Sequence, residues 1–448
     1  MELTDFAIIF GTVGLALFAV IITLRWEPMM VLVLASAMVE TYFGLDVGIE
    51  VDNLMLRLTD AIAVMAVAAA LLRFFAIRQI DVSVRWWLLV SICWGVAALY
   101  GSTIYGLATA LNFYRQHFYL SAIALYLMTF HLSAADIRRA AIIWVGAATI
   151  IMAYSLLAKI DPSLISDFVV EASNMGIYST YNAYASERVI VAGAAMVMCQ
   201  AALICLGGWA AMKGALFMRL LTIALIIMMF LQYHRTTWLA FIAGAIAMAQ
   251  TNLRYFARLA PVGALVVCIV AILWLTGLAA GQDFLTPAVT QAISEPLDAR
   301  QSTAIWRIEG WRILVGEAIA QGPFRILFGG GFGVGYERQI GNASIIFSPH
   351  NMYVEIFLNS GLIGLLPMLA FFASLLRRAF ALQRAGIPTD GLDPSVAVAL
   401  IVSILVYCVS YSLGHDQAVL IGLLTAALAS QASVPQRQEQ DSRLSAVR

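Results

Sequence analysis

Three basic residues of the 448-residue chain, Arg235, Arg307 and His350, border long apolar segments or lie in a loop between them. Arg307 precedes Trp311 by four positions, so both side chains share one face of a helix. His350 and Asn351 open an apolar segment, which puts the imidazole near the positive end of a helix dipole. Arginine is always ionised and binds phosphate oxygens through paired hydrogen bonds, and a neutral imidazole can accept a hydroxyl proton. These residue types could therefore hold an anionic group and activate an alcohol.

Each of these residues also has a purely structural interpretation. Arg235 can be an arginine that extends its charge from a helix end to the membrane surface. Arg307 can be a solvated charge beside an interfacial tryptophan, and a lone histidine such as His350 is more often structural. The functional interpretation rests on all three residues lying on the same side of the predicted membrane.

Composition places the chain in a membrane. Hydrophobic residues make up 62% of it and charged residues 12%, and the mean hydropathy is +0.89. Soluble domains carry about 25% charged residues, so a water-soluble fold is excluded. The five cysteines lie inside apolar runs and predict neither a disulfide framework nor a metal cluster. The formal net charge of +0 gives no indication of a nucleic-acid partner.

Apolar runs long enough for membrane helices recur along the whole chain. They cover about 6–24, 29–43, 58–75, 86–104, 118–130, 140–158, 189–206, 215–231, 238–249, 259–280, 352–376, 396–413 and 419–429. The first two runs are short and share a tight junction. The sequence therefore predicts an all-α polytopic bundle of 12–13 transmembrane helices.

Arginine clusters predict the orientation of this bundle, because Lys and Arg favour the cytoplasmic ends of short loops. The clusters lie at 73–85, 138–139, 213–219, 254–258 and 377–384, all on one side if the helices alternate. The opposite loops are acidic, with Asp46, Glu50 and Asp52 in the first of them. The orientation of the N-terminus stays open, since the first two runs can either span fully or form one re-entrant pair.

One connection is much longer than the others. Residues 281–349 join two strongly apolar runs on the outer side, and loops longer than about 15 residues are usually functional or disordered. Within it, 303–321 carries apolar residues at helical spacing, which predicts an amphipathic helix. We expect an N-terminal bundle at 1–280, this loop at 281–349, C-terminal helices at 350–433 and a disordered cytoplasmic tail at 434–448.

Short motifs accompany these chemical residues. His-Asn-x-Tyr begins at His350 and is followed by Gly361-x-x-Gly364. Upstream lie Arg307-x-x-x-Trp311, a glycine-rich turn at 329–335 and Arg-Thr-Thr-Trp-Leu-Ala from Arg235. In this combination, over about 232–366, the chain resembles the O-antigen ligase and O-antigen polymerase superfamily, and its multi-helix pattern is similar throughout.

This resemblance implies a bacterial inner-membrane enzyme with a large periplasmic loop and a fold of the glycosyltransferase C type. Such an enzyme transfers glycan from undecaprenyl diphosphate to an acceptor hydroxyl on the periplasmic face, with inversion and without metal or other cofactor. The acceptor is another glycan, a lipid A core or a protein, so polymerase and ligase both stay open. Membrane lipid is a further partner, and nucleic acid is not expected.

Carried over by position, the resemblance makes His350 the catalytic histidine, and Arg235 and Arg307 the residues that bind the donor diphosphate. Asn351 and Trp311 would support them. Family members often have an acidic residue two positions before the glycine, where this chain has Asn359, and Glu355 lies one turn earlier. A supporting role for Glu355 is therefore an open expectation.

Other functions compete with this one. A transporter or flippase of lipid-linked glycan would need charged residues inside the bundle, whereas the runs are nearly free of charge at their centres. A non-catalytic scaffold gives no reason for the arginines and histidine to converge. Glu50 and Asp52 could form an acidic metal site, although an acidic loop explains them, and Tyr178, Tyr181 and Tyr184 could stack on sugars or form an interfacial belt.

Overall fold

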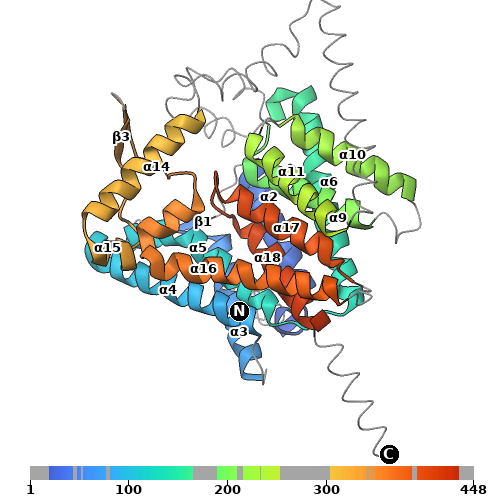
Figure 1. Ribbon diagram of the computed structural model, residues 1–448, viewed down its shortest axis with the longest axis horizontal. Coiled ribbons are helices and arrows are strands. Elements are labelled where there is room, and N and C mark those ends of the chain that lie inside the picture. Colours follow the sequence, from blue (N-terminus) through green and yellow to red (C-terminus); the bar gives the residue numbers. More distant parts are fainter. Residues whose placement is uncertain are drawn as a thin grey trace, which may run out of the picture.

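The structure, a computed structural model, describes residues 20–43, 48–51, 54–76, 81–164, 189–208, 215–232, 234–252, 303–340, 343–346, 348–385 and 391–432. These residues are mostly helical (Figure 1), so the predicted helical membrane bundle is confirmed in its main feature. The predicted spans at 6–24 and 259–280 lie largely or wholly outside them, as do 281–302 and the tail at 434–448. The count of 12–13 spans and the division into domains therefore stay predictions.

Four of the described helices are long and apolar enough to cross a membrane. They are α3 (Leu58–Ala76), α4 (Val82–Tyr105), α6 (Ala134–Ile160) and α16 (Met352–Arg384). Shorter apolar helices accompany them: α2 (Glu27–Phe43), α9 (Ala192–Gly208), α10 (Ala215–Phe230) and α17 (Pro394–Tyr407). Each of these helices overlaps a run that the sequence predicts, although α17 ends at Tyr407, before the end of the predicted run at 413. A helix satisfies its backbone groups internally, as lipid requires.

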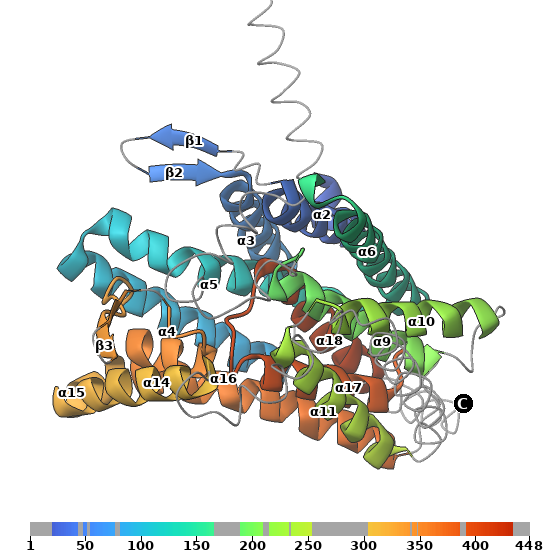
Figure 2. The ribbon, with the colours of Figure 1, turned by 90° about the horizontal axis from the view of Figure 1, so that it is seen from above.

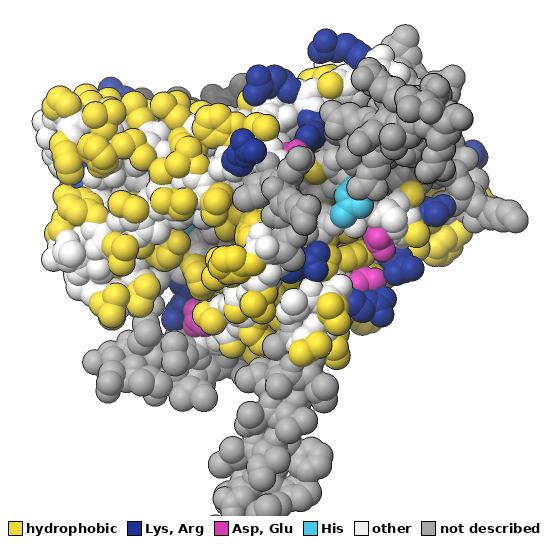
Figure 3. Space-filling view, turned by 90° about the horizontal axis from the view of Figure 1, so that it is seen from below, with side chains coloured by type: hydrophobic (Ala, Val, Ile, Leu, Met, Phe, Trp, Pro, Cys, Tyr) yellow, Lys and Arg dark blue, Asp and Glu magenta, His cyan; other side chains and the backbone are white. Residues whose placement is uncertain are grey.

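The outer surface of the bundle suits a membrane. Side chains of α4 that are exposed include Leu89, Ile92, Val96 and Leu99. Figure 3 shows a broad surface of mainly hydrophobic side chains on the face seen from below. A soluble monomer rarely exposes a continuous apolar surface of this kind, whereas lipid covers one at no cost.

The remaining helices complete the bundle. They are α5 (Leu107–Met128), the short η1 (Pro162–Leu164), α11 (Arg235–Thr251), α14 (Thr303–Ala320), α15 (Pro323–Phe328) and α18 (His415–Ala432). Helix α4 packs against α5 and α16, α5 packs against α18, and α11 packs against α17. In the core, the ring of Trp87 from α4 lies 4.7 Å from that of Phe371 in α16.

Helix α5 is longer than predicted. The apolar pattern predicts a helix from 118, but α5 begins at Leu107, directly after Gly106. Gly106 has a φ of 86°, a left-handed conformation that lets α4 end and α5 begin within one residue. This part of the helix contains the polar residues Arg115, Gln116 and His117, so its hydrophobicity does not identify it as a helix, although His117 is buried.

The mostly helical structure agrees with the expected all-α membrane protein, and two short antiparallel hairpins accompany its helices. Strands β1 (Gly48–Val51) and β2 (Leu54–Arg57) pair next to the start of α3, with Gly48 opposite Arg57. Strands β3 (Arg338–Ile340) and β4 (Ala343–Ile345) pair inside the long connection, with Arg338 opposite Ile345. Figure 2 shows the first hairpin at the edge of the molecule. Strands of three or four residues are too short for a clear period-two pattern.

The glycine-rich turn is held between two membrane helices. The backbone N–H groups of Gly330 and Gly331 donate to the carbonyls of Leu358 and Asn359 in α16, at 2.8 and 2.9 Å. On its other side, the N–H of Phe332 donates to the Ala97 carbonyl of α4 at 3.2 Å. Glycine is required here because a Cβ on Gly331, which has a φ of 81°, would lie 2.7 Å from the backbone of Gly101. This anchored turn positions Tyr336 and Arg338, which follow it.

Candidate active site

His350 lies immediately before α16 in an unusual backbone conformation. Its φ is 49°, and no other non-glycine residue in the described ranges has a positive φ. Asn351 is the N-cap of α16, with its side chain accepting from the N–H of Val354 at 3.0 Å, as expected for asparagine at this position. The next N–H, of Met352, donates to the Cys408 carbonyl at 3.0 Å. Strained backbone of this kind is held by its surroundings and occurs often at functional sites.

Helix α14 reaches this loop from the side. The indole N–H of Trp311 donates to the Pro349 carbonyl at 2.7 Å, directly before His350. The guanidinium carbon of Arg307 lies 5.5 Å from the centroid of the Tyr411 ring, and the His350 ring lies 6.3 Å from the same ring. The structure therefore brings Arg307, Trp311 and His350 together, with Tyr411 next to both the arginine and the histidine.

The predicted amphipathic helix at 303–321 is present as α14, but only part of its apolar stripe is buried. Leu314 and Ala318 are buried and pack in one cluster with Tyr336 and Leu358. Ile308 and Ile319 are exposed, and the side chains of Ile305 and Trp306 lie outside the described residues. The buried positions hold α14 against α16, and Arg307 and Trp311 project from the same helix to the His350 loop.

Arg338 is a further cation at this site, which the sequence analysis did not identify. Its side chain is 3% exposed, and its Nη1 donates to the Tyr336 carbonyl at 2.8 Å. The side chain crosses α14 at Gly310, where a Cβ would lie 2.7 Å from Nε of Arg338. No motif or periodicity marks Arg338, because it lies on the three-residue strand β3.

Burial and positive charge act together on His350. They lower the pKa of the imidazole from 6.5 to about 4, through desolvation first and then through the guanidinium groups of Arg307 and Arg338. At neutral pH the imidazole is therefore uncharged, and a neutral imidazole has one ring nitrogen that can accept a proton. This is the form that a general base requires.

Glu355 belongs to a buried hydrogen-bond network one turn into α16. Its carboxyl group, in a residue that is 7% exposed, accepts from the hydroxyls of Ser412 and, at 3.4 Å, of Tyr336. Asn359 donates to the Tyr336 hydroxyl at 2.9 Å and to the Glu355 carbonyl at 2.8 Å. Burial and the nearby Glu355 raise the pKa of Tyr336 well above its ordinary value, so its hydroxyl stays protonated and can donate. Asn359 occupies the position where the family often has an acidic residue. It thus belongs to the same hydrogen-bond network as Glu355.

Arg235 is the first residue of α11, as the sequence predicts for a helix rim. The centre of α11 packs closely on α17, since a Cβ added to Gly244 would lie 2.8 Å from the Ala399 carbonyl. The C-terminal end of α11 meets the C-terminal end of α16, where the Gln383 side chain donates to the Thr251 carbonyl. Helices α11 and α16 therefore begin at the same end of the bundle, and Arg235 lies at the end where His350 lies. α17 packs against both helices, so Arg235 stands one helix away from the other residues.

Several expected features lie outside the described residues. These are Asp46, Asp52, the side chain of Glu50 and the tyrosines Tyr178, Tyr181 and Tyr184. Within the described ranges, no group of three or more His, Cys, Asp or Glu side chains is arranged to hold a metal ion.

An ion pair joins two of the helices. Arg115 of α5 and Asp60 of α3 form it, at 3.2 Å.

Apolar spans and a cationic site at one end of the helices define a multi-pass membrane protein. The family model described as O-antigen ligase matches residues 220–369, the segment that holds Arg235, Arg307, Arg338, His350 and Glu355. The match confirms the resemblance to the O-antigen ligase and polymerase superfamily that the motifs predict. No curated protein matches the chain significantly.

Proposed function

We propose that this protein is an inverting, metal-independent glycosyltransferase, a polysaccharide polymerase or an O-antigen ligase. It moves glycan from undecaprenyl diphosphate to an acceptor hydroxyl, at the periplasmic face of the bacterial inner membrane. The observation that carries the proposal is the partly buried His350 imidazole, which lies beside Arg307, Arg338 and the Trp311-bound Pro349 in the segment that matches the O-antigen ligase family. The family is associated with ligase and polymerase activity of the glycosyltransferase kind.

In the proposed reaction, the acceptor oxygen attacks the anomeric carbon of the first donor sugar. The bond from this carbon to the phosphate oxygen breaks, and undecaprenyl diphosphate leaves with the electron pair. His350 accepts the proton of the acceptor hydroxyl, which contributes typically about 10² to 10⁴-fold. Attack opposite the leaving group inverts the anomeric configuration.

Arginine side chains stabilise the leaving diphosphate. Arg307 and Arg235 bind its oxygens, because fixed cations at the site of developing negative charge lower the barrier more than a proton donor can. After burial and Arg307, Arg338 further lowers the pKa of the imidazole by repulsion, which favours its neutral form. Trp311 and Asn351 support His350, the first through the Pro349 carbonyl and the second by capping α16.

The first test uses the purified full-length protein in lipid nanodiscs, with undecaprenyl-diphosphate-linked oligosaccharide as donor. The variant is His350→Asn, because asparagine tolerates the positive φ of this position and lacks a base. We expect new glycosidic bonds from the wild type, insensitive to EDTA, and a loss of about 10² to 10⁴-fold in the variant.

The matched control is His131→Ala, since His131 is exposed and its ring contacts only Ser430 among the described hydrogen bonds. Retained activity in His350→Asn, or an equal loss in both variants, contradicts the proposal. Nuclear magnetic resonance of the product linkage checks inversion. Polymerase and ligase are separated by gene deletion: loss of long chains from every fraction indicates a polymerase, and long chains left on carrier lipid indicate a ligase.

The alternative is a transporter of lipid-linked glycan without catalysis. One observation favours it, the ion pair between Arg115 and Asp60, whose side chains are 13% and 21% exposed between α5 and α3. A transporter moves labelled donor across a vesicle membrane without making new bonds. Donor translocation that persists in His350→Asn, with no glycosidic product from the wild type, supports this alternative.

A further inference from the structure

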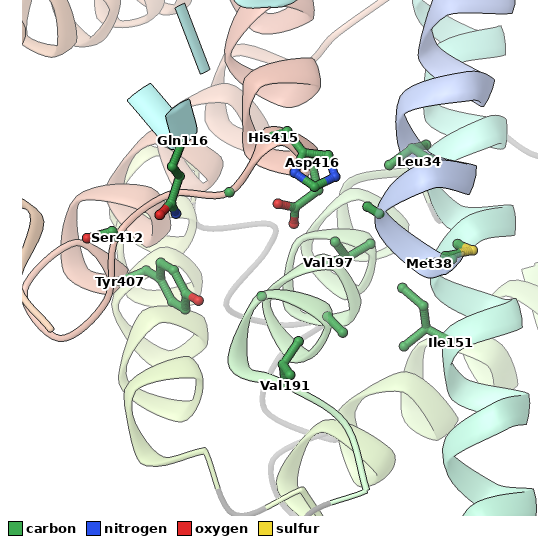
Figure 4. A pocket seen from close by; sticks show the side chains of 14 residues that line it. Leu34, Met38, Gln116, Ile151, Val191, Val197, Tyr407, Ser412, His415 and Asp416 are labelled. Atoms are coloured by element: carbon green, nitrogen blue, oxygen red, sulfur yellow. The ribbon is translucent and has the colours of Figure 1, made fainter. Parts of the chain in front are cut away.

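A second polar region lies on the other side of Tyr407 from His350. It is a cavity of about 220 Å³ between α2, α5, α6, α9 and the connection from α17 to α18 (Figure 4). Polar side chains that line it are Gln116, Tyr407, Ser412, His415 and Asp416. No motif in the sequence assigns any of these five residues to a site.

The two walls of this cavity differ in chemistry. Leu34, Met38 and Ile151 form an apolar wall from α2 and α6. Across from them, Figure 4 shows the Asp416 carboxylate directed into the cavity, with the Gln116 amide on the same polar side. The described lining residues include neither lysine nor arginine.

This lining selects the class of ligand. A diphosphate is disfavoured, because the Asp416 carboxylate repels an anion and no lining cation offsets it. A lipid tail is disfavoured by the polar wall. The Gln116 amide donates to the Leu413 carbonyl and the Asp416 carboxylate accepts from Gln417, but their other hydrogen-bonding groups would be left without partners under an apolar ligand. A sugar fits both walls, because its hydroxyls donate to carboxylate and accept from amide, while its C–H faces contact aromatic and apolar groups. The volume is below the range of about 300 to 1,000 Å³ for drug-sized ligands, which suits one or two sugar rings.

The cavity is connected to His350 by two short contacts. Tyr407 lines it and stacks on Tyr411 with 5.2 Å between ring centroids, and the Tyr411 ring is 6.3 Å from that of His350. Ser412, which also lines the cavity, donates to Glu355. One wall of the cavity is thus two aromatic rings away from the imidazole.

We infer that this cavity binds carbohydrate of the acceptor, with Asp416 and Gln116 holding sugar hydroxyls while the terminal hydroxyl reaches His350. The inference rests on the proposed transferase function and deepens it by naming where the acceptor is recognised. Donor and acceptor then occupy regions of opposite charge, on the two sides of Tyr407 and Tyr411.

Two variants test the cavity without altering His350. Asp416→Asn keeps the volume and removes the charge. Gly193→Leu fills the space, because a Cβ at Gly193 makes only an ordinary contact of 3.8 Å with Oδ2 of Asp416, and the longer chain extends past it. The matched control is Gly146→Leu in α6, where a Cβ meets no atom within 4 Å.

Initial rates are measured with donor and acceptor varied separately, on full-length protein in nanodiscs. We expect the acceptor KM to rise about tenfold in Asp416→Asn and at least as much in Gly193→Leu, as for the loss of one or more hydrogen bonds to a charged group, with the donor KM unchanged. Gly146→Leu should match the wild type. A change confined to the donor KM, or no change in either variant, overturns the inference while the transferase function stands.

A second readout does not require turnover. The probe is one oligosaccharide repeat unit, released from the polysaccharide of the strain that carries the gene, and its binding is followed by saturation-transfer nuclear magnetic resonance. Binding to the wild type that is lost in Gly193→Leu supports the cavity even if no glycosidic bond is ever formed, in which case the proposed function alone fails. Equal binding to wild type and Gly193→Leu contradicts the cavity.

Discussion

Tyr407 and Tyr411 separate two polar regions of the same end of the bundle that differ in charge. On one side, Arg307 and Arg338 act on the partly buried imidazole of His350 and make its surroundings cationic. On the other side, Asp416 and His415 line a cavity whose described residues include no permanent cation. The contrast teaches that charge can sort two ligands at one site: an anionic group is drawn to the first region and a neutral, hydroxyl-rich group to the second.

The largest effect is expected when the cationic region loses Arg307, which is partly buried. Arg307→Ala should lower kcat by about 10² to 10³-fold, as removal of one preorganised donor at a developing negative charge does. Arg312→Ala is the matched control, since Arg312 is on the same helix, is 77% exposed and pairs with Glu309 at 2.7 Å. Initial rates with lipid-linked donor check this, and equal rates in the two variants would contradict a role for Arg307.

A smaller effect is expected where the two regions are joined. Glu355→Ala should lower the free energy of unfolding by about 1 to 3 kcal/mol, because it leaves the hydroxyls of Tyr336 and Ser412 without their buried acceptor. Glu355→Gln keeps an acceptor oxygen and should lose less. Thermal unfolding in detergent measures both, and a Gln variant that is less stable than the Ala variant would show that the network does not depend on accepted hydrogen bonds.

The smallest effect concerns pH. His350 works as a base only while neutral, so kcat/KM for the donor should fall as the pH drops through its lowered pKa of about 4. Arg338→Gln removes one of the two cations, so the pKa of the imidazole rises toward 6.5 and the acidic limb moves to higher pH. A pH–rate profile measures the shift. An acidic limb that does not move would show that Arg338 does not affect the pKa of His350.

The same lowered pKa has a consequence for stability. The unfolded imidazole takes up its proton near pH 6.5 and the folded one only near 4, so the unfolded state binds more protons between these values. The folded protein therefore loses stability as the pH falls from about 6.5 to 4. In Arg338→Gln this loss should be smaller.

The sequence predicts those parts of the structure that depend on neighbours in the chain. Within the described residues the apolar runs are helical, Asn351 is an N-cap, and Arg307 and Trp311 share a helix face. Each of these features depends on residues within about four positions. The start of α5 at Leu107 was missed because polar side chains interrupt the apolar pattern there. The hairpin β3–β4 was missed because its strands are too short to show alternation.

Contacts between distant segments could not be predicted in this way. Arg338 acts on His350 because the glycine-rich turn is held between α4 and α16, and Ser412 reaches Glu355 across 57 positions because α16 and α17 meet at one end. Asp416 faces a cavity only through the packing of five separate segments. Periodicity identifies which side of a helix is apolar, whereas the neighbour that covers it depends on how all the helices pack together.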